Sequence, residues 1–249
     1  MGDLTIPSWL PPPSALSIVV SRYKEPLDIW GDVAPNVYLY AKFDTPQVND
    51  SIPHDSFRHY ELLPNAGREG QTYCHHIYTH YDNLEPIVIF SQGDPFDILV
   101  PQTNNTEQLV RTAQESLLQD FDPVTIYNYD LLHDVAEWGP IDWSSPEEGY
   151  WITPKQLETL TPAPYDMAEF WQRLFLEPHP VAVRVLHGAV FAVRRETIWR
   201  HPPEFYRRCL DQFADAGKNA VNPEIGFFME RAWLAAWSKG NWKDRVEIP

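Results

Sequence analysis

The stretch that decides the fold runs from residue 64 to residue 97 and reads PNAGREGQTYCHHIYTHYDNLEPIVIFSQGDPFD. After a Pro-Asn turn, apolar residues recur between Tyr73 and Tyr81 at the spacing of one helix face. Residues 87–90 (IVIF) then predict a buried strand, and the polar residues 91–94 (SQGD) end it. Turn, helix, strand and polar tip form half of an α/β unit. Because ligand sites of α/β sheets lie at the carboxyl ends of strands, we expect the chemistry at this tip.

Composition describes an acidic globular chain. The 249 residues carry a formal net charge of −16, and 43% of them are hydrophobic, which is typical of a packed core. Such a charge repels phosphate backbones and argues against nucleic acid or an anionic membrane as a partner. No apolar run approaches the roughly 20 residues that span a bilayer. We therefore expect a small-molecule partner; the sequence leaves the oligomeric state open.

The two cysteines and the amino terminus bear on the compartment. Asp3 stands where a signal peptide would be basic, and the first apolar run is short and follows three prolines. Cys74 and Cys209 both fall on apolar faces of expected helices, which is typical of buried free thiols. These features predict a cytoplasmic protein.

Outward from the central stretch, the pattern predicts a Pro-rich lead at residues 1–13 and a single α/β domain at residues 14–249. The expected sheet is mixed and mostly parallel, with helices on both faces. Strands are expected at residues 16–20, 37–41, 60–63, 124–127 and 181–193, the last broken at His187-Gly188. Further helices are expected at residues 106–119 and 167–176, from Pro203 to near Gly217, and from Asn222 to near Gly240.

Residues 121–165 hold three tryptophans, Trp138, Trp143 and Trp151, among glycine, proline and acidic residues. Long loops in compact domains are often functional, so one interpretation is a lid that closes over the site. The other is that the tryptophans only fasten the loop to the body. The role of residues 100–180 stays open.

An anion site is the main candidate within the central stretch. Gly67-Arg68-Glu69-Gly70 precedes the expected helix, whose first amides carry partial positive charge and lack partners. Glycines let a ligand approach the backbone, and Arg68 adds a fork of donors for phosphate or carboxylate. The alternative is an ordinary turn in which Arg68 pairs with Glu69.

Residues 92–97 (QGDPFD) follow the buried strand and add Gln92, Gly93, Asp94 and Asp97 to the candidates. Two carboxylates could hold a divalent cation, but Pro95 and Phe96 separate them, and turn capping by Asp94 explains the pattern as well. A zinc site at Cys74, His75, His76 and His80 is disfavoured because no Glu follows His76, as the metalloprotease motif requires, and Cys74 is expected on another helix face. We therefore predict neither metal nor cofactor.

Three further residues are candidates for acid–base chemistry. Glu224 lies in the first turn of the last helix, where a general base could stand, although the helix dipole alone would favour a glutamate there. His187 interrupts a strand and could be aimed into a cleft by a bulge. Glu230 is interpreted as forming a buried ion pair with its neighbour Arg231.

Several segments together resemble a family that is abundant in fungi and known only as a domain of unknown function. The resemblance covers roughly residues 16–99 and 181–240 and rests on these quoted segments: SIVVSRYKEPLDIW, LLPNAGREGQTYCHHIYTHYDNL, IVIFSQGDPFD, HGAVFAVRRETI and NPEIGFFMERAW.

The order of segments also resembles that of a reduced GT-A glycosyltransferase. Enzymes of this class share a fold that binds a nucleotide sugar. The resemblance implies that Ser21, Arg22 and Glu25 touch the nucleotide and that Glu224 is the base. Residues 91–94 stand where the Asp-x-Asp metal motif would be, so a metal-independent member is implied. Basic residues would then replace the metal, with Arg22, Arg68, Arg194 and Arg195 as candidates.

Our leading hypothesis is accordingly a metal-independent group-transfer enzyme, glycosyltransferase-like, with catalytic residues Glu224, Asp97 and His187. One alternative is another enzyme of fungal specialised metabolism that acts on a small acid or amine. A second alternative is a non-catalytic protein that binds a small ligand. Fold similarity alone does not choose among them.

Overall fold

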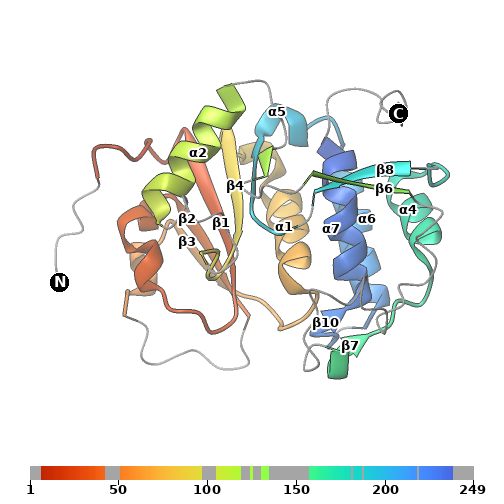
Figure 1. Ribbon diagram of the computed structural model, residues 1–249. Helices are drawn as coiled ribbons and strands as arrows, with labels where there is room; N and C mark the ends of the chain where they lie inside the picture. The colour runs from red at the N-terminus through yellow and green to blue at the C-terminus, as the bar shows by residue number, and fades with distance from the viewer. Residues whose placement is uncertain are drawn as a thin grey trace.

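The computed structural model describes residues 7–42, 51–96, 105–118, 124–125, 130–134, 157–180, 182–186, 188–217 and 219–237. Its centre is a six-stranded sheet in the order β3-β2-β1-β4-β9-β5 (Figure 1). The strands are β1 (Leu16–Arg22), β2 (Val37–Ala41), β3 (His59–Leu62), β4 (Ile87–Gln92), β5 (Val124–Thr125) and β9 (Phe191–Arg194). β3, β2, β1 and β4 are parallel, and β9 is antiparallel to both β4 and β5. The predicted single α/β domain with a mixed, mostly parallel sheet is confirmed.

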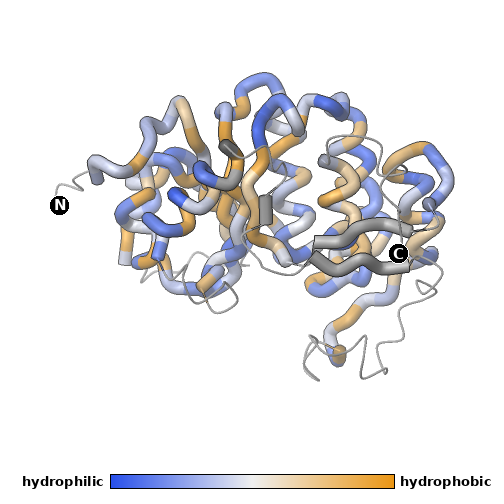
Figure 2. Tube along the Cα trace, turned by 45° about the horizontal axis from the view of Figure 1, so that its top comes forward, coloured by the Kyte–Doolittle hydropathy of each residue, from blue (hydrophilic) through white to orange (hydrophobic). Residues whose placement is uncertain are grey.

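Helices cover both faces of this sheet, as predicted. One face packs against the 3-10 helix η1 (Asp28–Asn36) and α2 (Thr106–Leu118). The other packs against α1 (Arg68–His80), α4 (Met167–Phe175), α6 (Pro203–Asp215) and α7 (Glu224–Trp237). Alternate strand residues supply the two cores: Val19 and Phe90 lie in the core of the α1 face, and Ile18 and Ile89 in that of the α2 face. Hydrophobic residues accordingly run along the central strands (Figure 2).

The order of the strands contains a topological switch point between β1 and β4. From β1 the chain moves outward through β2 to β3, and α1 then carries it back to β4 on the other side of β1. Ser21 is therefore paired with Gln92 at the carboxyl ends of these strands. Open α/β sheets bind ligands outside such a point, because the neighbouring connections diverge there.

The remaining described elements are short. They are η2 (His54–Ser56), η3 (Tyr81–Asn83), α5 (Arg195–Ile198), a sheet of β6 (Asp130–Asp134) with β8 (Ala182–Leu186), and a sheet of β7 (Leu160–Thr161) with β10 (Asn222–Pro223). The strand predicted at residues 181–193 is thus two strands in different sheets. Asn222 and Pro223, predicted as helix cap and first turn, pair with β7, and α7 begins at Glu224. Most of the tryptophan-rich stretch, including all three of its tryptophans, lies outside the described residues.

The prediction of two free thiols is wrong. Cys74 on α1 and Cys209 on α6 form a disulfide, with their Cα atoms 6.3 Å apart. The apolar faces that suggested buried thiols pack against each other, which places both cysteines in one core. The argument for a cytoplasmic location rested in part on those thiols and loses that part of its support. No described helix combines the length and apolarity needed to cross a bilayer.

Candidate functional site

The start of α1 is shaped by a glycine in the left-handed region. Gly67 has φ 69° and is the N-cap, and it makes no side-chain capping hydrogen bond. A Cβ here would lie 2.4 Å from Cβ of Gln71 and 3.0 Å from Phe213 of α6. Gly70 packs against the same phenylalanine ring. Glycines thus let α1 begin tightly against α6, with its first-turn amides at the carboxyl end of the sheet.

Arg68 continues this unusual backbone. Its φ of 48° is also left-handed, which costs a non-glycine residue about 1–2 kcal/mol. Its guanidinium carbon lies 4.6 Å from the ring centre of Phe227 on α7, and its Nε lies 3.6 Å from Oε2 of Glu69. Strained residues are held in place by their surroundings and cluster at functional sites. The turn aims Arg68 across the gap between α1 and α7.

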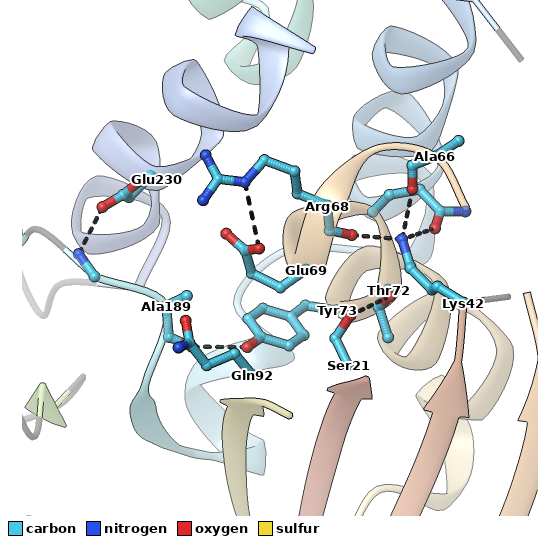
Figure 3. Close-up of polar contacts among 12 residues, drawn as sticks. Ser21, Lys42, Ala66, Arg68, Glu69, Thr72, Tyr73, Gln92, Ala189 and Glu230 are labelled. Carbon is cyan, nitrogen blue, oxygen red and sulfur yellow. Dashed lines mark hydrogen bonds and ion pairs between the residues drawn. The ribbon is translucent and has the colours of Figure 1, made fainter. Parts of the chain in front are cut away.

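Glu230 of α7 is the second charged group at this position. Its Oε1 accepts a 2.7 Å hydrogen bond from the amide of Gly188. Burial raises the pKa of Glu230, and the positive charge of Arg68 opposes that rise. In Figure 3 the guanidinium of Arg68 is joined to the carboxyl group of Glu69, while the carboxyl group of Glu230 is directed at the amide of Gly188. This arrangement places an arginine beside a carboxyl group that binds a proton more readily than an exposed glutamate does.

Lys42 follows β2 and is 3% exposed. Its Nζ donates to the carbonyl oxygens of Ala66 and Arg68, both at 2.5 Å, and to Oε1 of Gln71 at 3.0 Å. Burial lowers the pKa of Lys42 to about 7, and Glu69 opposes the shift. We did not predict this residue from the sequence. The one available signal was a lysine directly after the apolar residues 37–41.

Uncharged side chains tie α1 to the sheet below this group. The hydroxyls of Ser21 and Thr72 are 3.0 Å apart, and the phenol of Tyr73 donates to the carbonyl of Ala189 at 2.7 Å. The amide of Gln92 donates to the carbonyl of Asp94 at 2.8 Å. Gln92 follows Phe90 by two residues and so projects on the face that carries α1.

The loops after β1 and β4 interlock at the switch point. Nε of Arg22 donates to the carbonyl of Glu25, and Oε2 of Glu25 accepts the amides of Tyr23 and Lys24 at 2.7 and 3.0 Å. A Cβ on Gly93 would lie 2.3 Å from that oxygen. Glu25 therefore packs directly on Gly93, which places these two predicted residues together.

The predicted aspartate pair is only half described. Oδ1 of Asp94 accepts the amide of Phe96 at 3.1 Å, which is the turn-capping role. Asp97 and His187 lie outside the described residues. Within the described ranges, no group of three or more His, Cys, Asp or Glu side chains is arranged to hold a metal ion.

Glu224 lies on another side of α7 from Glu230. It is buried, and its Oε2 accepts the amide of Ala163 at 2.9 Å. At 100° per residue, Glu224 is about 200° around the helix from Gly226, whereas Glu230 is about 40° from it. Because Gly226 and Phe227 are the α7 residues near Arg68, Glu230 shares the side of the arginine.

Arg194 lies at the other end of the sheet. It pairs with Ile87, the first residue of β4, five residues or roughly 16 Å from Gln92. Its guanidinium donates to the carbonyl of Leu117 near the end of α2, where a cation is favoured by the helix dipole. We therefore remove Arg194 from the candidate site.

A profile of one protein family matches residues 47–246, and its description is "Protein of unknown function (DUF3431)". This match spans most of the chain, so the chain belongs to that family. Neither a curated protein nor a solved structure matches it.

Proposed function

We propose that this family member is a group-transfer enzyme that binds an anionic donor without a metal, with glycosyl transfer from a nucleotide sugar as the leading case. The observation that carries the proposal is that Arg68, at the carboxyl end of the sheet, lies near enough to the buried Glu230 for its positive charge to oppose the rise of the Glu230 pKa. A cation beside a carboxyl group of raised pKa supplies both charge stabilisation and proton transfer. The resemblance to GT-A enzymes supports the choice of donor.

Arg68 and the first-turn amides of α1 hold the leaving group. A departing phosphate gains negative charge as its bond to the transferred group breaks, and a guanidinium fork stabilises it best at that moment. Lys42, behind the same turn, adds a second positive charge to the region. Arg68 and the first-turn amides together do the work that a divalent cation does in metal-dependent transferases.

Glu230 is the general base in this proposal, in place of Glu224. The acceptor hydroxyl or amine attacks the transferred carbon while its proton passes to the Glu230 carboxylate. The helical position of Glu230 beside Arg68 supports this role, whereas Glu224 is turned toward Ala163. Because burial raises the pKa of Glu230, turnover should increase with pH beyond the range in which ordinary carboxyl groups titrate.

Binding of the donor is tested by thermal shift with UDP, GDP and inorganic pyrophosphate, each with EDTA present. We expect stabilisation that EDTA leaves unchanged and that Arg68→Gln removes. Arg207→Gln is the matched control, because Arg207 is exposed on α6 and pairs only with Asp211 among the ion pairs of the described chain. A melting temperature that none of the three ligands changes would contradict the proposal and favour a small acid or amine substrate.

The role of Glu230 is tested by Glu230→Gln. Release of UDP or GDP from a panel of nucleotide sugars should fall about 10²–10⁴-fold, the usual contribution of a general base. The melting temperature should change little, because the amide keeps the shape and can still accept from Gly188. Glu204→Gln, at an exposed residue of α6, is the control. A Glu230→Gln variant with wild-type turnover would exclude Glu230 as the base, and a loss that follows Glu224→Gln instead would restore the original assignment.

A further inference from the structure

Lys42 occupies the junction between β2 and the left-handed turn at Gly67 and Arg68. Its nitrogen is shared among the carbonyls of Ala66 and Arg68 and the side chain of Gln71 (Figure 3). The two carbonyls belong to the residues on either side of Gly67. Through these hydrogen bonds Lys42 therefore holds the turn that carries the side chain of Arg68.

Three acceptors around one nitrogen require three N–H donors. Only the ammonium form of lysine has three; the neutral amine has two, together with a lone pair. When Lys42 loses a proton, that lone pair must face one of the three oxygens, which repels it. The grip on the turn thus depends on the protonation of a side chain that is almost fully buried.

We propose that Lys42 is a positioning residue for the anion site: its ammonium fixes the turn that presents Arg68, and its deprotonation releases that turn. This inference rests on the proposed function, because it takes Arg68 to be the residue that binds the anion. Lys42 does not touch the anion and acts through the backbone of α1. The strained φ of Arg68 supplies the tendency to relax once the grip is lost.

The charges near Lys42 set the direction of the pH effect. Glu69 of α1 is the charged side chain that acts on it, Arg68 contacts it only through its carbonyl oxygen, and Arg22 of β1, on the opposite strand face from Ser21, projects away from α1. Burial lowers the pKa of Lys42 to about 7. The charged form, and with it the turn that favours anion binding, is therefore present at lower pH and is lost as the pH rises through about 7. By linkage, an anion at the site raises the pKa of Lys42.

The test measures the dissociation constant of UDP and of inorganic pyrophosphate by calorimetry between pH 6 and pH 9. For wild type, the constant should rise with pH above 7, approaching tenfold per unit. Lys42→Arg keeps the charge at every pH and should flatten this dependence. Lys42→Met should bind at least tenfold more weakly at pH 6, and the Arg207→Gln control should match wild type. The pH dependence should persist in Glu230→Gln, which removes the titration of Glu230 as its source.

A second measurement needs no ligand and separates the two proposals. Protection factors from hydrogen exchange are followed for the amides of Gly67 and Gln71, which bond to the carbonyls of Ala220 and Gly67. They should fall between pH 6 and pH 9 in wild type and be low throughout in Lys42→Met. Constant protection in both proteins would overturn the role of Lys42. Absence of anion binding with the expected change in protection would overturn the proposed function and leave the role of Lys42 in the turn supported.

Discussion

At the scale of single residues, His76 shows how burial fixes a charge state. The side chain is fully buried, and its Nδ1 bonds to the hydroxyl of Tyr40 at 2.9 Å. Within the described chain, its Nε2 has no hydrogen-bond partner. Burial, together with the nearby side chains His80, His59, His75 and Arg58, lowers the pKa of His76 well below the ordinary value of 6.5. His76 is therefore neutral in the folded protein.

This environment predicts a loss of stability in acid. Because the folded pKa lies below the unfolded one, the unfolded chain takes up a proton first as the pH falls below about 6.5. Each pH unit below that value should remove up to about 1.4 kcal/mol of unfolding free energy per such histidine, with no effect above it. Urea denaturation between pH 5 and pH 8 measures this. His76→Gln should reduce the slope, and an unchanged slope would show that His76 is protonated in the fold.

At the scale of elements, the sequence predicted α1 and the strands around it well, because periodicity and turn residues are local. The strand predicted at residues 37–41 has the observed bounds, and the Gly67–Gly70 motif does stand at a helix start. What the sequence could not supply was the rotation of one helix against another. Choosing between Glu224 and Glu230 needs the first residue of α7 and the position of Arg68 in space. Lys42 escaped notice because its three partners lie 24 to 29 residues away.

The start of α1 gives a prediction at this scale. Gly67→Ala adds a Cβ that meets Gln71 and Phe213, whereas Gly217→Ala, also at a positive φ, adds one with nothing within 4 Å. Both substitutions strain the backbone, but only the first also crowds its neighbours. Gly67→Ala should therefore cost about 1–3 kcal/mol more unfolding free energy than Gly217→Ala, as overpacking does. Equal losses in chemical denaturation would mean that α1 can shift away from α6.

At the scale of the whole molecule, the mostly parallel sheet could be predicted from strands that alternate with other elements, but the strand order, and with it the switch point, could not. Nor could the pairing of the cysteines. Cys74 and Cys209 are 135 residues apart, and nothing local relates the two helices that carry them. The same limit applies to Arg194: its position at the amino end of β4 depends on the direction of β9, which the sequence does not specify.

The disulfide gives the last prediction. A bridge that closes so long a loop restricts the unfolded chain. Removing it should lower the free energy of unfolding by about 2–5 kcal/mol, the usual cost of losing a native disulfide. Both sulfurs are buried, so a reductant should act only under partly denaturing conditions, where it should lower the urea midpoint of wild type. The double variant Cys74→Ala/Cys209→Ala should already have the lower midpoint and be insensitive to reductant. Two thiols titrating in the unreduced, denatured protein would contradict the bridge.

Anion binding, in contrast, should survive loss of the disulfide in the Cys74→Ala/Cys209→Ala variant. The start of α1, at the carboxyl end of the sheet, is held by other contacts: Ser21 with Thr72, Tyr73 with Ala189, and Lys42 with the turn. The disulfide lies on the face of α1 that packs on α6, so its loss should lower global stability before it disturbs Arg68. Calorimetric titration of UDP with wild type and with the Cys74→Ala/Cys209→Ala variant, both in native buffer, measures this directly. A parallel loss of affinity and stability would mean that the α1–α6 contact, rather than the grip of Lys42, sets the geometry of the turn.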